Sequence, residues 1–239
     1  MYKLKTTKIL KYFALTLAET LITIGIIGIV AALTIPGLIQ SYQKHQTVVK
    51  LKKIYAILNQ IARNSSNENG DAISFLTANS NVNSKTTQEF FEKYWFAYLN
   101  VPTIDTKNSF QYKYINGEYN GLNIITDYSA GRVLFTTIDG ISYFVTLMTW
   151  VKDENTETNK AVYSSDQTIY VDLNGKTAPN TMGRDVFIFK IDFNNNNAVP
   201  FCSKLSKEDI NQKCKSYGNC CAEKIKRDGW TIAHDYPWK

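Results

Sequence analysis

The hydrophobic pattern of the chain is dominated by one long apolar stretch near its N-terminus, residues 14–38. No side chain that is charged at neutral pH occurs between Glu19 and Lys44. About 20 apolar residues in an α-helix span the roughly 30 Å hydrocarbon core of a bilayer. The pattern therefore predicts a membrane-spanning helix over residues 18–39. Glu19, a carboxylate at the start of this helix, is a candidate functional residue, because a charge is costly in lipid.

Beyond the apolar stretch, hydrophobic residues recur at three- and four-residue spacing up to Arg63. They form one stripe: Leu51, Ile54, Tyr55, Leu58, Ile61 and Ala62. This pattern predicts that the helix continues as an amphipathic segment over residues 40–63 and packs against a globular head, residues 64–239.

The head combines helical and strand patterns. The polar residues 64–84 predict a loop with a helical turn near 72–76, and an aromatic stripe predicts a helix over 85–100. From Phe110 the hydrophobic period changes to two, and Asn-Gly or Asp-Gly pairs mark tight turns. The predicted strands are 110–114, 132–137, 141–150, 168–173 and 186–193, with a polar loop over 152–160. Two short helices, one capped by Ser206 and one over 220–227, complete a predicted α+β fold with a mainly antiparallel sheet.

The start of the apolar stretch resembles the N-terminal signature of type IV prepilins and type II secretion pseudopilins. A basic leader, residues 1–14, is followed by Leu15 and the run Thr16-Leu17-Ala18-Glu19, and Pro36 occupies the family's proline position. The family usually has Gly and Phe where this chain has Ala14 and Leu15. The resemblance implies a pilin-like fold, with the long helix packed on the sheet of the head.

The resemblance also implies how the chain is processed and assembled. A prepilin peptidase that is also the N-methyltransferase would cleave after Ala14 and methylate the amine of Leu15. Glu19 would then neutralise the Leu15 amine of a neighbouring pilin or pseudopilin subunit, which relieves much of the cost of burying both charges. The implied protein is a structural filament subunit and not an enzyme. The signature is shared by type IV pili, type II secretion pseudopili and DNA-uptake pili.

Small residues recur along the apolar helix. Gly25, Gly28 and Ala32 would permit close helix–helix contact in lipid, or are simply tolerated in a lone span. Pro36 removes one backbone hydrogen bond and is expected to loosen the helix locally.

The formal net charge of +6 raises the question of a nucleic-acid partner. The leader holds four lysines and no acid, so its removal would lower the charge to +2. Further lysines at 44, 50, 52 and 53 are placed to meet lipid headgroups. We therefore expect a membrane and no nucleic acid as the partner of these charges. Because lysines flank both ends of the apolar stretch, charge alone leaves the topology open.

The four cysteines lie within the last forty residues, at Cys202, Cys214, Cys220 and Cys221. Such a cluster predicts two disulfides in an oxidising compartment. The expected protein is therefore a single-pass protein of a bacterial cytoplasmic membrane, with its N-terminus in the cytoplasm and its head outside. A bridge between the adjacent Cys220 and Cys221 would be strained, so two pairings stay open. The alternative is a zinc site with His234, although the C-x2-C spacing common in such sites is absent.

The head contains no common catalytic motif. Asp172, Asn174 and Asp185 are candidate calcium ligands, and the alternative is a strand connection that turns at Asn174-Gly175 with Asp172 capping the loop. An alternative function is a membrane-anchored binding module or adhesin that does not polymerise. In that case the tryptophans at 95, 150, 230 and 238 could stack on glycans.

Overall fold

The computed structural model describes residues 16–77, 82–99, 103–105, 109–118, 124–125, 131–152, 159–175 and 177–238. The chain divides into two units, Met1–Lys44 and His45–Lys239. Helix α1 (Leu17–Asn69) belongs to both, and its apolar part lies in the first. By length and composition α1 is able to cross a membrane, as the sequence predicts.

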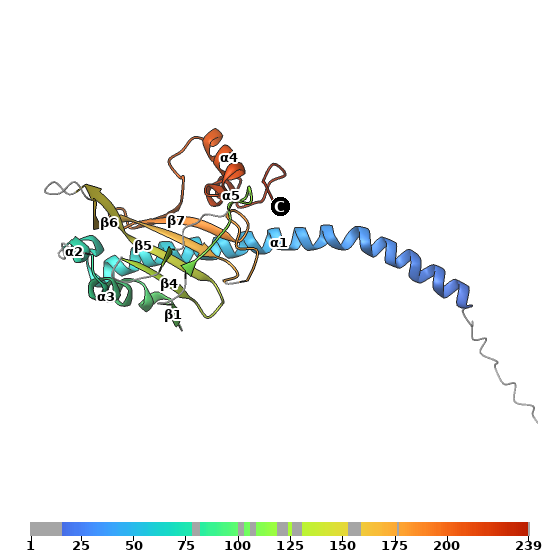
Figure 1. The fold of residues 1–239 in the computed structure, drawn as a ribbon, viewed down its shortest axis with the longest axis horizontal. Coiled ribbons are helices and arrows are strands. Elements are labelled where there is room, and N and C mark those ends of the chain that lie inside the picture. The colour runs from blue at the N-terminus through green and yellow to red at the C-terminus, as the bar shows by residue number, and fades with distance from the viewer. Residues whose placement is uncertain are drawn as a thin grey trace, which may run out of the picture. The chain divides into compact units, whose positions relative to one another are not determined.

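A six-stranded antiparallel sheet forms the centre of the second unit (Figure 1). Its order is β1-β4-β5-β6-β7-β8. The strands are β1 (Thr103–Asp105), β4 (Arg132–Thr136), β5 (Ser142–Lys152), β6 (Asn159–Asp172), β7 (Val186–Asp192) and β8 (Asn197–Pro200). A separate pair joins β2 (Ser109–Phe110) to β3 (Ile124–Ile125). The α+β class and the antiparallel sheet are confirmed, and so is the β4–β5 hairpin around Asp139-Gly140.

The remaining helices flank this sheet. They are α2 (Ala72–Thr77), α3 (Ser84–Tyr94), the 3-10 helix η1 (Phe96–Tyr98), α4 (Lys207–Ser216) and α5 (Cys221–Arg227). Ser206 caps α4 as predicted, because its hydroxyl oxygen accepts the backbone N–H of Asp209 at 3.1 Å. In Figure 1, α4 and α5 lie together on the β7 side, and α5 contacts β7.

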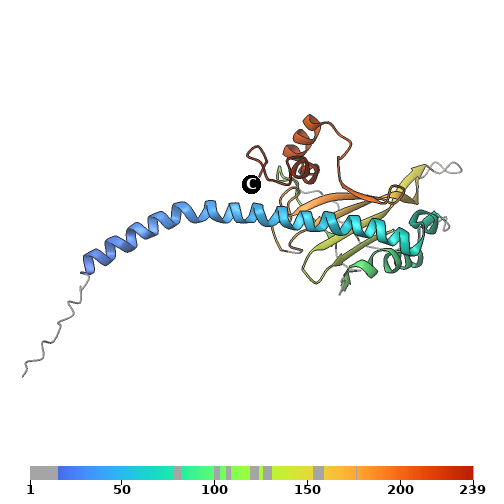
Figure 2. The same cartoon turned by 180° about the vertical axis from the view of Figure 1, so that it is seen from behind.

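The core lies between α1 and one face of the sheet, along which the part of α1 in the second unit runs (Figure 2). Leu51, Ile54, Leu58 and Ile61 of α1 are completely buried, which confirms the predicted amphipathic stripe. The sheet contributes alternate residues, among them Phe135, Tyr143, Val145, Ile169, Phe189 and Ile191. Because side chains alternate across a strand, the residues between them point to the opposite face.

Helix α1 continues six residues beyond Arg63, so the predicted boundary is wrong. The hydroxyls of Ser65 and Ser66 donate to the carbonyls of Ile61 and Ala62, one helical turn earlier. Ser65 is also completely buried, so the helix packs against the head at this position. This polar sequence remains helical because Ser65 is buried there with its hydroxyl satisfied by a carbonyl of the same helix.

Other elements also differ from the prediction. The helix expected over 85–100 ends at Tyr94 and gives way to η1. Strand β6 begins at Asn159 rather than 168 and pairs with β5 as far as Lys152, so both ends of the expected 152–160 loop are strand. Strand β8 was not predicted, because the four asparagines at 194–197 are typical of a loop.

A side chain from α1 forms hydrogen bonds with the backbone of the edge strand β8. Asn59 Nδ2 donates to the carbonyl of Ala198 at 3.1 Å, and Asn59 Oδ1 accepts the N–H of Ala198 at 3.1 Å. Unpaired backbone groups on an edge strand invite pairing with another chain. Asn59 thus satisfies both backbone groups of one edge residue and ties α1 to the sheet.

We expect Asn59→Leu to destabilise the head by about 2 kcal/mol, because it leaves the Ala198 N–H and C=O without their partner. Urea unfolding of the full chain in detergent, followed by circular dichroism, measures this loss. Gln60→Leu, an exposed change one residue away, is the matched control. Equal stability of the two variants would contradict the role given to Asn59.

Candidate functional sites

The start of α1 is held by a reciprocal cap between Thr16 and Glu19. The Thr16 hydroxyl oxygen accepts the N–H of Glu19 at 3.2 Å, and Glu19 Oε2 accepts the backbone N–H and the hydroxyl of Thr16, each at 2.9 Å. This is a capping box, in which a Thr and a Glu three residues later satisfy each other's backbone donors. This role of Glu19 is not among the predictions above, although the Thr-x-x-Glu spacing signals it. The predicted cleavage and methylation positions, Ala14 and Leu15, lie outside the described residues.

The apolar side chains that follow Glu19 are exposed in the single chain. The large ones range from 78% exposed at Leu33 to 50% at Ile35 and Ile39. A Cβ added at Gly25 or Gly28 would meet nothing within 4 Å, and Ala32 is also exposed. Pro36 lies inside the continuous helix. An apolar surface of this extent requires a cover of lipid or of other helices.

The calcium candidates lie together where β6 ends and β7 begins. Asp172 and Asp185 are 2% and 6% exposed, and Asp172 pairs in register with Val186. Asp185 accepts the N–H groups of Asn180 and Thr181, one on each oxygen, at 2.9 and 2.5 Å. Asp172 Oδ1 accepts the N–H of Asn174 at 3.1 Å.

These bonds favour the alternative that the sequence offered, a strand connection shaped by its carboxylates. Calcium takes six to eight oxygen ligands. Among the described residues, no group of three or more His, Cys, Asp or Glu could hold a metal ion. The calcium site therefore stays a prediction, and the hydrogen bonds of Asp172 and Asp185 shape the turn.

The burial of this pair changes how it titrates. Burial raises the pKa of Asp172 to about 7 against the lowering effect of the Asn174 N–H, and the nearby Asp185 carboxylate adds to the rise. Burial likewise raises the pKa of Asp185, although the N–H groups of Thr181 and Asn180 act to lower it. The head therefore carries a carboxyl group that titrates near neutrality.

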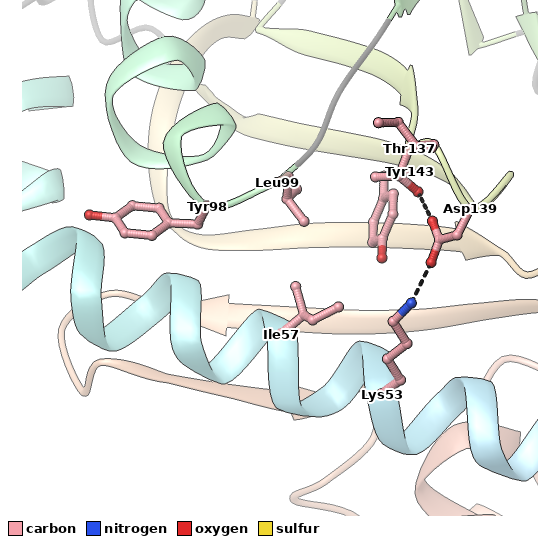
Figure 3. A pocket seen from close by; sticks show the side chains of 8 residues that line it. Lys53, Ile57, Tyr98, Leu99, Thr137, Asp139 and Tyr143 are labelled. Carbon is pink, nitrogen blue, oxygen red and sulfur yellow. Dashed lines mark hydrogen bonds and ion pairs between the residues drawn. The ribbon is translucent and has the colours of Figure 1, made fainter.

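A cleft of about 370 Å³ opens between α1 and the β4–β5 turn (Figure 3). Lys53 Nζ lies 2.7 Å from Asp139 Oδ2, and the Thr137 hydroxyl donates to Asp139 Oδ1 at 2.5 Å. Burial alone would raise the pKa of Asp139, but the bonds from Lys53 and Thr137 hold it below its ordinary value. Ile57 and Leu99 lie along the wall of the cleft.

The polar groups of this cleft engage one another. The ion pair is half exposed and contributes about 0–1 kcal/mol, so its main effect is to fix α1 relative to the turn. Lys50 behaves similarly, since its Nζ donates to the carbonyl of Leu173 at 2.7 Å. The prediction that these two lysines face lipid headgroups missed both partners, which lie far away in the sequence.

The cysteines form the disulfides Cys202–Cys220 and Cys214–Cys221. This selects one of the two open pairings and removes the thiolates that a zinc site with His234 would need. A buried cation lies beside them: Lys224 donates to Asp235 at 2.9 Å and to Asp228 at 3.0 Å. Burial would lower the pKa of Lys224, but these two carboxylates raise it. Two disulfides and the ion pairs of Lys224 thus stabilise the C-terminal region.

The three tryptophan side chains that the structure describes do not form an exposed platform. Trp95 is completely buried, and Trp230 packs half-buried against Tyr55 with ring centroids 5.4 Å apart. Trp238 is half-buried beside Tyr236, and the side chain of Trp150 lies outside the described residues. Glycan stacking on Trp95 is therefore wrong as a prediction.

Residues 37–239 match the family of unknown function DUF6613. The chain belongs to this family. Comparison with curated proteins and with solved structures gives no match. The DUF6613 match begins at Gly37, so it contains the end of the apolar stretch, the amphipathic part of α1 and the entire head. It excludes Glu19, and the prepilin-like signature is consequently a separate observation about this DUF6613 chain.

Proposed function

We propose that the chain is a prepilin-like structural subunit, anchored in a bacterial cytoplasmic membrane by α1 with its head outside. A prepilin peptidase removes residues 1–14, and the processed subunit assembles through α1 into a pilus or pseudopilus. The head is then displayed on the filament surface.

The observation that carries the proposal is the exposed apolar surface of α1 with a carboxylate at its first turn. Lipid covers such a surface in a single-span anchor, and the helices of other subunits cover it in a filament. Besides forming the cap with Thr16, the Glu19 carboxylate is costly at the start of an apolar helix in lipid unless a partner neutralises it. The prepilin-like signature around Glu19 suggests what this partner is: the terminal amine of a neighbouring subunit.

The two disulfides support the external position of the head, because such bonds persist in oxidising compartments. With the head outside and one spanning helix, the leader lysines remain in the cytoplasm. This orientation agrees with the positive-inside rule for the residues before the helix.

The test is the N-terminal peptide mass of the protein purified from its native membrane. We expect a chain that begins at Leu15 and carries one additional methyl group on its amine. A chain that begins at Met1 in assembled or membrane-bound protein would contradict processing. It would leave the single-span binding module, the other candidate function, as the better description.

A further inference from the structure

A second cavity, of about 420 Å³, lies on the sheet face opposite α1, where β7 and β8 meet the loop around Cys202. Lys190 of β7 and Val199 of β8 are register partners and both line it. Their neighbours Phe189, Ile191 and Ala198 point into the core with α1. Phe201 and Lys204 of the loop and Lys213 of α4 form the other wall.

The charges that line the cavity do not cancel. Asp192 is engaged by its own turn, where Oδ1 accepts the N–H of Asn194 at 3.0 Å and Oδ2 accepts the side-chain amide of Asn195 at 2.6 Å. Asp166 lies 3.7 Å from Lys190. Lys204 and Lys213 are exposed and form no ion pair with any residue in the described ranges. Three lysines and two aspartates line the cavity, so their charges sum to +1 and favour an anionic group of a ligand over a cationic one.

An apolar floor lies between these polar groups. The Phe201 ring is half-buried and has Lys190 Nζ 5.8 Å from its centroid. Val199 lies beside it on the strand. An aromatic ring next to an aliphatic side chain provides a flat surface on which the C–H face of a sugar ring can pack, while amides and cations contact its polar substituents.

The loop that carries Phe201 and Lys204 is fixed before any ligand arrives. The Cys202–Cys220 disulfide joins it to the start of α5. Arg227 Nη2 also donates to the carbonyls of Ser203 and Leu205, at 2.9 and 3.1 Å. A preformed site avoids the ordering cost that a mobile loop would add to binding.

We propose that this cavity binds a carboxylated sugar, such as a uronate residue of an acidic polysaccharide. Lys204 and Lys213 hold the carboxylate, and Phe201 and Val199 support the sugar ring. This assigns to the head a ligand-binding role that is separate from filament assembly.

The test is calorimetric titration of the full chain in a polyoxyethylene detergent, which has no sugar headgroup to compete. The probes are trigalacturonate, the neutral galactose trimer and inorganic phosphate. We expect saturable binding of trigalacturonate that weakens as salt is added. Lys204→Gln with Lys213→Gln should weaken it at least about tenfold, because two charged contacts are lost. Phe201→Leu should weaken it severalfold.

Lys207→Gln is the matched control, since Lys207 is exposed at the other end of α4 and does not line the cavity. Unchanged affinity in this variant supports the assignment, provided that the thermal unfolding of all variants coincides. The proposal is overturned if the neutral trimer or phosphate binds as tightly as trigalacturonate, if no probe binds, or if the Lys207 variant loses as much affinity as the double variant.

Discussion

Replacing Glu19 by Gln is expected to abolish filament assembly while the head remains folded. Gln retains the size of Glu and is accepted at the same position of a capping box, so the start of α1 keeps its cap. What Gln lacks is the negative charge that would neutralise a neighbour's terminal amine. Leaving one charge of a buried pair without its partner is strongly destabilising. We therefore expect filaments to fall by on the order of a hundredfold or more.

The comparison that isolates the charge is Thr16→Val, which removes the capping hydroxyl and keeps the Glu19 carboxylate. We expect this variant to assemble. Sheared filaments are quantified by immunoblot and electron microscopy, and the membrane fraction shows that each variant is inserted. Normal filaments from Glu19→Gln would refute charge neutralisation, and loss of filaments in Thr16→Val alone would assign the effect to the cap.

The elements that could be predicted from the sequence depend on short-range patterns. The apolar stretch, the stripe from Leu51 to Ala62 and the hairpin at Asp139-Gly140 repeat over a few residues and have one stable geometry. The Ser206 cap is likewise contained within four residues. Each therefore follows from local propensity and the burial of one face.

The features that sequence alone missed depend on partners far apart in the chain. Asn59 contacts Ala198 and Lys53 contacts Asp139 because α1 packs along one face of the sheet, and no local pattern specifies either contact. The choice between the two open disulfide pairings also depends on how α4 and α5 pack. Residues 64–69 have a loop-like composition, and only their hydrogen bonds and burial make them helical.

Because Asp172 is a buried carboxyl group, we expect the head to become less stable as the pH rises from about 4 to about 7. Its pKa is raised in the folded protein, from 3.8 to about 7, so the folded state binds a proton that the unfolded state has already released. This contribution is fully present below pH 4 and is lost as the pH passes 7. Between these two pH values, Asp172 lowers the free energy of unfolding by about 4 kcal/mol.

Asp172→Asn removes this dependence, because the amide resembles the protonated acid and its oxygen can still accept the Asn174 N–H. We expect the free energy of unfolding of the variant to exceed that of the wild type by a few kcal/mol at pH 8 and to approach it at pH 4. Urea unfolding of the full chain in detergent across this range measures the difference. Asp166→Asn, which removes an exposed carboxylate from the same strand, is the matched control. A constant difference for Asp172→Asn would contradict a raised pKa.

The same titration distinguishes the two interpretations of the strand connection. Asn174 Oδ1 is buried and has no hydrogen-bond partner among the described residues, so it could serve either a tight turn or a cation. If the turn is the whole role of the pair, millimolar calcium should leave the wild-type curve unchanged at pH 8. A calcium site would instead restore at pH 8 the stability that ionisation removes, and would do so in the wild type and not in Asp172→Asn. An equal gain in both proteins would place the bound calcium elsewhere in the chain.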